Sequence, residues 1–173
     1  MRVVIVTGAP GAGKSTVATL VHDHLGDAGV PNALVEADEL RRAYPEPDPD
    51  DVRTRIASLV ASHARAGHDL VLVTETLETP DDLVRLRAAL PAAETLVVRI
   101  DADPGTTHER VRAREPSAWS GLPALLDSAR RLAAEMRSLP ADLVVRNDGR
   151  PPEAAAAEIL AAVRPAGAPT PRT

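Results

Sequence analysis

The only lysine of this 173-residue chain, Lys14, stands in a glycine-rich octet that begins at Gly8 and ends at Ser15. Lysine and arginine together total 20 residues, so the other 19 are arginines. The octet has the pattern G-x-x-x-x-G-K-[ST], in which backbone N–H groups and a compact ammonium hold phosphate groups. An apolar run at 3–6 precedes it and helical spacing follows it, which is the context that the pattern requires. The octet therefore predicts the binding of a nucleoside triphosphate.

Each part of this loop has an expected role in holding the nucleotide. Lys14 should reach between the β- and γ-phosphates, Ser15 should give its hydroxyl to Mg²⁺, and Thr16 should reach the α-phosphate. The loop after the last expected strand carries Asn147 where adenine often rests in such proteins, and it lacks the Asn-Lys-x-Asp pattern that reads guanine. We therefore expect ATP with Mg²⁺, held by Gly8, Ala9, Gly11, Ala12, Gly13, Lys14, Ser15, Thr16, Arg110 and Asn147.

Acidic residues follow the second expected strand, at the edge where ligands of parallel sheets gather. Asp38 lies three residues before Arg41. This pair suits a general base that takes the proton of an acceptor hydroxyl, beside a guanidinium that holds the acceptor. Glu36 is expected to join the same acceptor site. Asp38 also fits the N-cap of a helix, because Asp-Glu-Leu-Arg is an ordinary helix start, and the two roles can coexist.

A second acid, Glu75, ends the third expected strand at 70–73. This segment resembles a Walker B strand with glutamate in place of the more common aspartate. Glu75 is predicted to hold Mg²⁺ through water or to touch the acceptor, and the alternative is that it caps the turn toward Pro80. Asp101 is a weaker candidate, because Asp101-Ala-Asp103-Pro is the ordinary start of a helix that Asp103 caps.

Arginines spaced four residues apart lie on the helix expected after Pro104. Arg110 and Arg114 share one face of that helix, whereas Arg112 points away. Two guanidiniums on one face suit a lid, at about 105–123, that clamps transferring phosphates and makes both residues catalytic together with Lys14 and Asp38. The alternative is a solvated, arginine-rich face.

The only aromatic residues are Tyr44 and Trp119. Both fall in segments expected to surround an acceptor, where a ring can stack on a base, a sugar or a drug. Packing against the edge of the domain is the alternative. The substrate-binding candidates are Glu36, Asp38, Arg41, Tyr44, Glu75 and Trp119, and the metal candidates are Ser15 and Glu75.

The elements that must position these residues are indicated by the periodicity of the apolar residues. Runs of strand length at 3–6, 33–35, 70–73, 96–100 and 143–145 alternate with helical spacing at 14–28, 51–66, 80–90, 104–114, 124–138 and 153–163. This alternation predicts β-α units on a parallel sheet, in a single domain over 1–163. Prolines between 45 and 49 predict a rigid loop, and the Pro/Gly/Ala-rich segment 164–173 predicts a disordered tail.

Composition excludes several classes of function. Cysteine is absent, which excludes disulfides and thiolate chemistry, and the five histidines show no metal-site grouping. A net charge of -5 argues against broad electrostatic capture of nucleic acid. No apolar stretch approaches the length of a membrane span, and no signal segment is evident. We expect a soluble, cytoplasmic protein that acts on small molecules.

With these motifs in order over 1–163, the chain resembles the small P-loop kinases, whose members include adenylyl-sulfate, gluconate and shikimate kinases and chloramphenicol phosphotransferase. It is also similar to short ATP-binding proteins of high-GC actinobacteria. The resemblance implies a P-loop NTPase three-layer α/β sandwich, with a five-stranded parallel sheet in the order 2-3-1-4-5 and helices on both faces. It places Lys14, Ser15, Arg110 and Arg114 around the phosphates, and Asp38 near the acceptor.

Three functions fit these observations. The first is an ATP- and Mg²⁺-dependent phosphotransferase that acts on a hydroxyl of a small metabolite, nucleoside or antibiotic. The second is an ATP-binding regulatory or accessory protein with weak ATPase activity. A polynucleotide or tRNA kinase is the third, although the acidic balance offers no extended basic track.

Overall fold

A computed structural model describes residues 1–91 and 94–163. Its centre is a five-stranded parallel sheet in the order β2-β3-β1-β4-β5, which confirms the predicted topology. The strands are β1 (Arg2–Thr7), β2 (Asn32–Glu36), β3 (Leu70–Thr74), β4 (Glu94–Asp101) and β5 (Leu143–Arg146). All the pairings are parallel, and β1 lies between β3 and β4. The carboxyl ends of the strands therefore meet at one edge of the sheet, where the glycine-rich loop begins.

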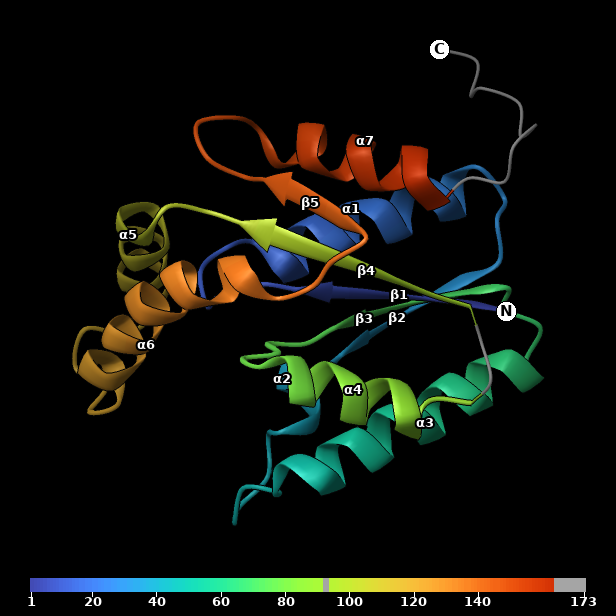
Figure 1. Cartoon of the computed structure of the whole chain (residues 1–173), viewed down its shortest axis with the longest axis horizontal. Coiled ribbons are helices and arrows are strands. Elements are labelled where there is room, and N and C mark those ends of the chain that lie inside the picture. Colours follow the sequence, from blue (N-terminus) through green and yellow to red (C-terminus); the bar gives the residue numbers. More distant parts are fainter. Residues whose placement is uncertain (92–93, 164–173) are drawn as a thin grey trace.

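Helices cover both faces of the sheet (Figure 1). Their bounds are α1 (Lys14–Asp27), α2 (Ala37–Leu40), α3 (Pro49–Arg65), α4 (Pro80–Ala89), α5 (Pro104–Arg114), α6 (Leu122–Glu135), the 3₁₀ helix η1 (Met136–Ser138) and α7 (Pro152–Val163). One face carries α1 and α7, and the opposite face carries α3 and α4. The pair α5 and α6 stands beyond the carboxyl ends of the strands (Figure 1).

The central strand explains this layering, because four consecutive residues of β1 are completely buried. Val3 and Ile5 pack on the α3 and α4 side, and Val4 and Val6 pack on the α1 and α7 side. A strand that is buried on both faces reads as a continuous apolar run, because neighbouring side chains point to opposite layers. Both layers are aliphatic, and they hold the strand ends in fixed positions relative to α1.

The segment between β2 and α3 shows the main differences from the sequence-based prediction of helices. The third helix begins at Pro49, inside the expected proline loop, because Asp48 is its N-cap and accepts hydrogen bonds from the N–H groups of Asp50 and Asp51. Proline suits this first helical position, because an N–H group there would have no hydrogen-bond partner within the helix. The polar segment that carries Asp38, for which a helix start was one alternative, forms the short helix α2.

The expected tail, 164–173, lies outside the described residues. Across the described part of the chain, none of the helices combines the length and the apolar character needed to cross a bilayer.

Candidate active site

The glycine-rich loop connects β1 to α1 and turns sharply at glycines with positive φ. Gly11 has φ 81° and Gly13 has φ 100°, a backbone conformation that favours glycine. Space is also restricted there, because a Cβ on Gly11 would lie 2.5 Å from the Thr107 carbonyl oxygen and one on Gly13 would lie 2.4 Å from Asn147 Nδ2. The loop is therefore a fixed cradle, with the N-terminus of α1 opening directly from it.

Lys14 is the first residue of α1, and its side chain folds back over the loop. The ammonium Nζ donates to the carbonyl oxygen of Gly8 at 3.0 Å and to that of Ala9 at 3.3 Å. The residue is only 8% exposed, and burial lowers the pKa of Lys14 to about 8. The nearby carboxylates of Asp38 and Glu75 act against this effect and favour the charged form.

One cavity of about 740 Å³ opens in front of the loop, within the size range of small-molecule sites. It brings together residues from four separate parts of the sequence: the loop with the start of α1, the segment around α2, the turn after β3, and the helices α5 and α6. The candidate residues that line it are Gly11, Gly13, Lys14, Ser15, Thr16, Asp38, Arg41, Arg110, Arg114 and Trp119.

The candidate base Asp38 lies at the mouth of this cavity with its side chain 72% exposed. Its Oδ1 is 3.9 Å from Nη1 of Arg41, so the expected acid and guanidinium pair is formed. The N-cap of α2 is Glu36, and Asp38 lies inside the helix. The N-cap alternative for Asp38 is therefore wrong, and its carboxylate is free of backbone hydrogen bonds within the described residues.

Arg41 is held from behind by Glu75. Nη2 of Arg41 donates to both Glu75 oxygens at 3.0 Å, and the Thr76 N–H donates to Oε1 at 2.8 Å. Burial raises the pKa of the Glu75 carboxyl, while Arg41 opposes that shift. Glu75 thus fixes a guanidinium at the end of β3, and its bond to Thr76 also matches the turn-capping alternative.

The two arginines of the expected lid differ in what they contact. Nη2 of Arg110 donates to the Asn147 carbonyl oxygen at 2.8 Å, and Nη1 lies 3.5 Å and 3.4 Å from the carbonyl oxygens of Gly11 and Ala12. Arg114 pairs with Glu115 at 2.7 Å and stays 63% exposed. Arg110 therefore ties α5 to the phosphate loop, whereas Arg114 lines the cavity and pairs only with its neighbour Glu115 within the described residues.

Asn147 does not present its side chain to a base in this structure. The residue is 3% exposed, and its Nδ2 donates to the Ala12 carbonyl oxygen at 2.8 Å. Its place behind Gly13 means that it supports the loop instead of lining the cavity. Nucleotide binding by Asn147, whose loop is expected to read the base through backbone groups, stays a prediction.

Two acceptor candidates lie away from the cavity. Glu36 shares its face of β2 with Asn32 and Leu34, so its side chain enters a different hollow at the sheet edge. Tyr44 is completely exposed and is not among the residues that line the main cavity. Trp119 does line it, with its ring packed against Gly121 and 46% of the residue exposed.

Several lining residues were missed by the sequence analysis. Thr76 lies beside the loop, with its Oγ1 3.4 Å from the Gly8 carbonyl oxygen, and its position after Glu75 was the available signal. A smaller adjoining hollow of about 290 Å³ shares Arg41 and Thr76 with the main cavity. Its other polar side chains are Arg53, Glu75, Glu78, Thr79 and Asp82. No local pattern indicated Arg53, which lies on α3 and outside the sequence motifs.

The described residues contain no group of three or more histidine or acidic side chains placed to hold a metal by themselves. Mg²⁺ fits the donor set in another way, because it usually keeps several waters and takes one or two protein oxygens together with the phosphates of the substrate. Ser15, at the start of α1 and on the cavity wall, supplies such an oxygen.

The parallel sheet with this loop at the end of its central strand has the architecture of P-loop proteins. The family model described as "AAA domain" matches residues 3–139, and the chain belongs to this family, AAA_33. The match spans β1 to the end of η1 and contains the loop, Asp38, Glu75, Arg110 and Arg114. No curated protein sequence matches the chain.

Solved structures of small kinases share the fold. A sugar kinase from Janibacter sp. HTCC2649 is 23% identical with a TM-score of 0.67, covering 93% of each chain. The Mycobacterium tuberculosis APS kinase CysC, in complex with AMPPNP and APS, is 23% identical with a TM-score of 0.67, covering 92% of this chain and 95% of that one. A gluconokinase from Sinorhizobium meliloti 1021 is 20% identical with a TM-score of 0.62, covering 92% and 90%. These likenesses establish the architecture, and the predicted resemblance to P-loop kinases is confirmed.

Proposed function

We propose that this protein is an ATP- and Mg²⁺-dependent phosphotransferase that phosphorylates a hydroxyl of a small molecule. The observation that carries the proposal is the single cavity that joins Lys14 and Ser15 of the phosphate loop to the carboxylate of Asp38. A phosphate cradle alone binds a nucleotide, whereas transfer also needs an acid beside the acceptor. The AMPPNP in the APS kinase CysC structure supports ATP as the donor.

The nucleotide is held in this proposal by the loop and by α1. The N–H groups at the start of α1 point to the phosphates, and the ammonium of Lys14 exchanges the Gly8 and Ala9 carbonyl oxygens for phosphate oxygens. Ser15 holds Mg²⁺, which supplies charge neutralisation for the β- and γ-phosphates when bound. Arg110, which contacts the loop, shares in that neutralisation in this proposal.

Transfer moves one phosphoryl group and one proton. The acceptor hydroxyl oxygen forms a bond to the γ-phosphorus as the bond from that phosphorus to the β,γ-bridging oxygen breaks, and ADP leaves with the electron pair. The hydroxyl proton passes to the Asp38 carboxylate. Lys14, Arg110 and Arg114 stabilise the charge on the phosphoryl oxygens during the transfer.

The polar hollow beside the main cavity supports an acceptor rich in hydroxyl groups. Its lining contains the guanidiniums of Arg41 and Arg53 and the carboxylates of Glu75, Glu78 and Asp82, and Arg41 is bonded to Glu75. Such a lining offers donors and acceptors together, which suits a sugar or polyol better than an apolar ring. In this proposal Glu75 positions Arg41, and Arg41 binds the acceptor. The sugar kinase and the gluconokinase with the same fold make sugars the first acceptors to test.

The test is ADP release with ATP and Mg²⁺ across sugars, polyols, nucleosides, adenylyl sulfate and hydroxylated antibiotics. We expect one acceptor class to raise the rate in a saturable way, and Lys14→Ala to abolish the rise. Arg112→Ala is the matched control, because it also removes one positive charge but its residue lies outside the cavity lining. The phosphorylated product is then identified by mass spectrometry.

A flat panel contradicts transferase activity. If the protein binds ATP and hydrolyses it slowly at a rate that no acceptor changes, the regulatory or accessory alternative replaces the proposal. A rise in rate that persists in Lys14→Ala would come from a contaminating kinase, and the panel would then give no support to the proposed transferase activity.

A further inference from the structure

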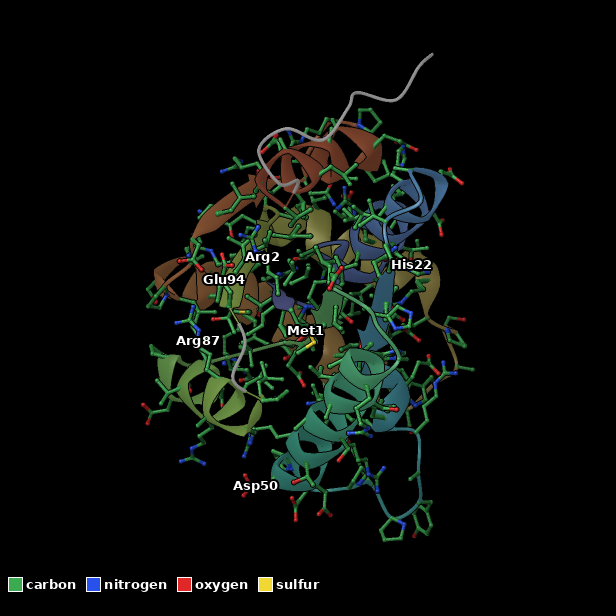
Figure 2. The ribbon with its side chains drawn as sticks, turned by 90° about the vertical axis from the view of Figure 1, so that its right-hand side faces the viewer. Met1, Arg2, His22, Asp50, Arg87 and Glu94 are labelled. Carbon is green, nitrogen blue, oxygen red and sulfur yellow. The ribbon has the colours of Figure 1, made fainter. Side chains whose placement is uncertain are left out.

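The sheet has an open edge at β2. Within the described residues β2 pairs with β3 alone, so its outer side presents backbone N–H and C=O groups that no other strand covers. A hollow of about 630 Å³ runs along this edge between α1 and α3. Figure 2 places His22, which lines it, on the flank of the molecule near α3. We call this surface the β2 groove; its lining residues are Thr19, His22, Asn32, Ala33, Leu34, Val35, Glu36, Glu39, Leu40, Leu59, His63 and His68.

The β2 groove has a histidine end. His22 Nδ1 lies 2.6 Å from Oδ1 of Asn32, the first residue of β2. His68 comes two residues before Leu70, which pairs with Asn32, and its ring lies edge-on to that of His63 at 5.1 Å. All three imidazoles therefore gather at the amino end of the strand.

The opposite end of the β2 groove is acidic. Glu36 is the last residue of β2, and Glu39 follows on α2. Oε1 of Glu36 is buried and has no hydrogen-bond partner within the described residues, which is a costly state for a carboxylate oxygen. Glu39 contacts Arg42 at 3.2 Å and keeps a side-chain exposure of 55%. Between the two ends lie Leu34 and Leu59, the latter 36% exposed.

We infer that a second copy of this chain occupies the β2 groove, with the two β2 strands antiparallel about a twofold axis at Leu34. This arrangement sets the histidine end of each copy against the acidic end of the other. A parallel arrangement would instead set histidines against histidines and carboxylates against carboxylates. Twofold pairing also continues the sheet from one copy into the next, which satisfies the open edge.

A single introduced cysteine tests the register, because the chain has no cysteine of its own. Residues directly opposite in an antiparallel pair have Cα atoms about 4.5–5.5 Å apart, within the range that a disulfide spans. We expect Leu34→Cys to form a covalent dimer under mild oxidation. Val84→Cys is the matched control, because Val84 is 64% exposed on α4, away from the β2 groove. Equal cross-linking of both variants overturns the proposal.

Charge exchange tests the end-to-end pairing by analytical ultracentrifugation over a concentration series. We expect a dimer in the wild type, about tenfold weaker dimerisation in His63→Glu or Glu39→Lys, and recovery in the double variant. His24→Glu is the control, since His24 lies on α1 outside the lining of the β2 groove. A wild type that stays monomeric throughout, or a dimer that both single exchanges leave intact, contradicts the inference. If the protein is a monomer that binds an extended peptide at this edge, the inference of a dimer is wrong and the partner is a strand from another protein.

Discussion

Two requirements on the position of the Lys14 ammonium conflict in the ligand-free protein. Its ammonium must be close enough to the loop to meet phosphate oxygens, and that position removes it from water. The result is a pKa lowered to about 8 by burial, even with two carboxylates nearby. Phosphate groups would supply the negative charge that the site lacks, so the charged lysine is stabilised by its ligand.

This conflict predicts how ATP affinity depends on pH. Bound phosphates favour the ammonium form, so binding takes up a proton once the free protein has lost it, above about pH 8. We expect the Kd for ATP to be flat below that pH and to rise by up to about tenfold for each further pH unit. Trp119, the only tryptophan and a cavity residue, allows the titration to be followed by fluorescence. A Kd that is constant through about pH 10 would show that Lys14 stays charged without ATP.

Asp38 is predicted to act on the proton of the acceptor and not on the nucleotide. Asparagine keeps the size of the side chain but cannot accept that proton as a carboxylate does. We expect Asp38→Asn to lower kcat by about 100-fold or more while the Kd for ATP changes by less than about threefold. Steady-state kinetics with the identified acceptor, together with an ATP titration, separate the two effects.

The exposed position of Asp38 makes this variant informative. Its carboxylate is 72% exposed and contacts Arg41 at 3.9 Å, so the substitution disturbs little of the packing. Glu39→Gln on the same short helix is the matched control and should leave kcat unchanged. Full activity in Asp38→Asn would remove Asp38 from the role of base.

At the scale of elements, α5 is the part of the proposed lid that contacts the loop. Arg110 contacts carbonyl oxygens of the loop and of Asn147, whereas Arg112 on the same helix is exposed and outside the cavity. We expect Arg110→Ala to lower kcat/KM by about 100-fold, because it removes both phosphate stabilisation and support of the loop. Arg112→Ala should stay within about twofold.

Thermal unfolding separates a lid role from a structural one. Arg110→Ala should lose kcat with a small change in Tm, because Arg110 lies at the edge of the cavity and not in the core. Equal loss of activity in Arg110→Ala and Arg112→Ala would instead indicate that the whole helix is a solvated face with no part in transfer.

The elements themselves were predictable because their signals are local. Five apolar runs gave the five strands, and the sheet order came from the resemblance to P-loop kinases. The loop was recognisable because one octet carries its glycines, lysine and serine together.

Side-chain contacts between distant elements left no such local signal. Asn147 Nδ2 bonds Ala12 across 135 residues, and Arg41 bonds Glu75 across 34. Both contacts depend on where strand ends meet. The direction of Glu36 was also missed, because the expected strand at 33–35 stopped before it, whereas β2 includes it and gives it the face of Leu34.

At the scale of the whole molecule, the phosphate site lowers the stability of the fold that contains it. The folded chain disfavours a charged Lys14, whose pKa falls from 10.5 to about 8, while the unfolded chain does not. Between these values the unfolded state binds more protons than the folded state, so stability rises with pH through this window. Below about pH 8 the cost is present in full.

Removing the charge should therefore stabilise the ligand-free protein while abolishing transfer. We expect Lys14→Met to increase the free energy of unfolding near neutral pH by about 1–2 kcal/mol, less than the full pKa difference implies, because the hydrogen bonds to the Gly8 and Ala9 carbonyl oxygens are lost. Urea unfolding of both proteins at several pH values provides the measurement. The advantage of Lys14→Met should shrink as the pH rises from about 8 to 10.5, since the wild type sheds its buried charge over that range. An advantage that is the same at every pH would mean that methionine acts through packing, and a variant less stable than the wild type at neutral pH would show that the ammonium already stabilises the empty loop.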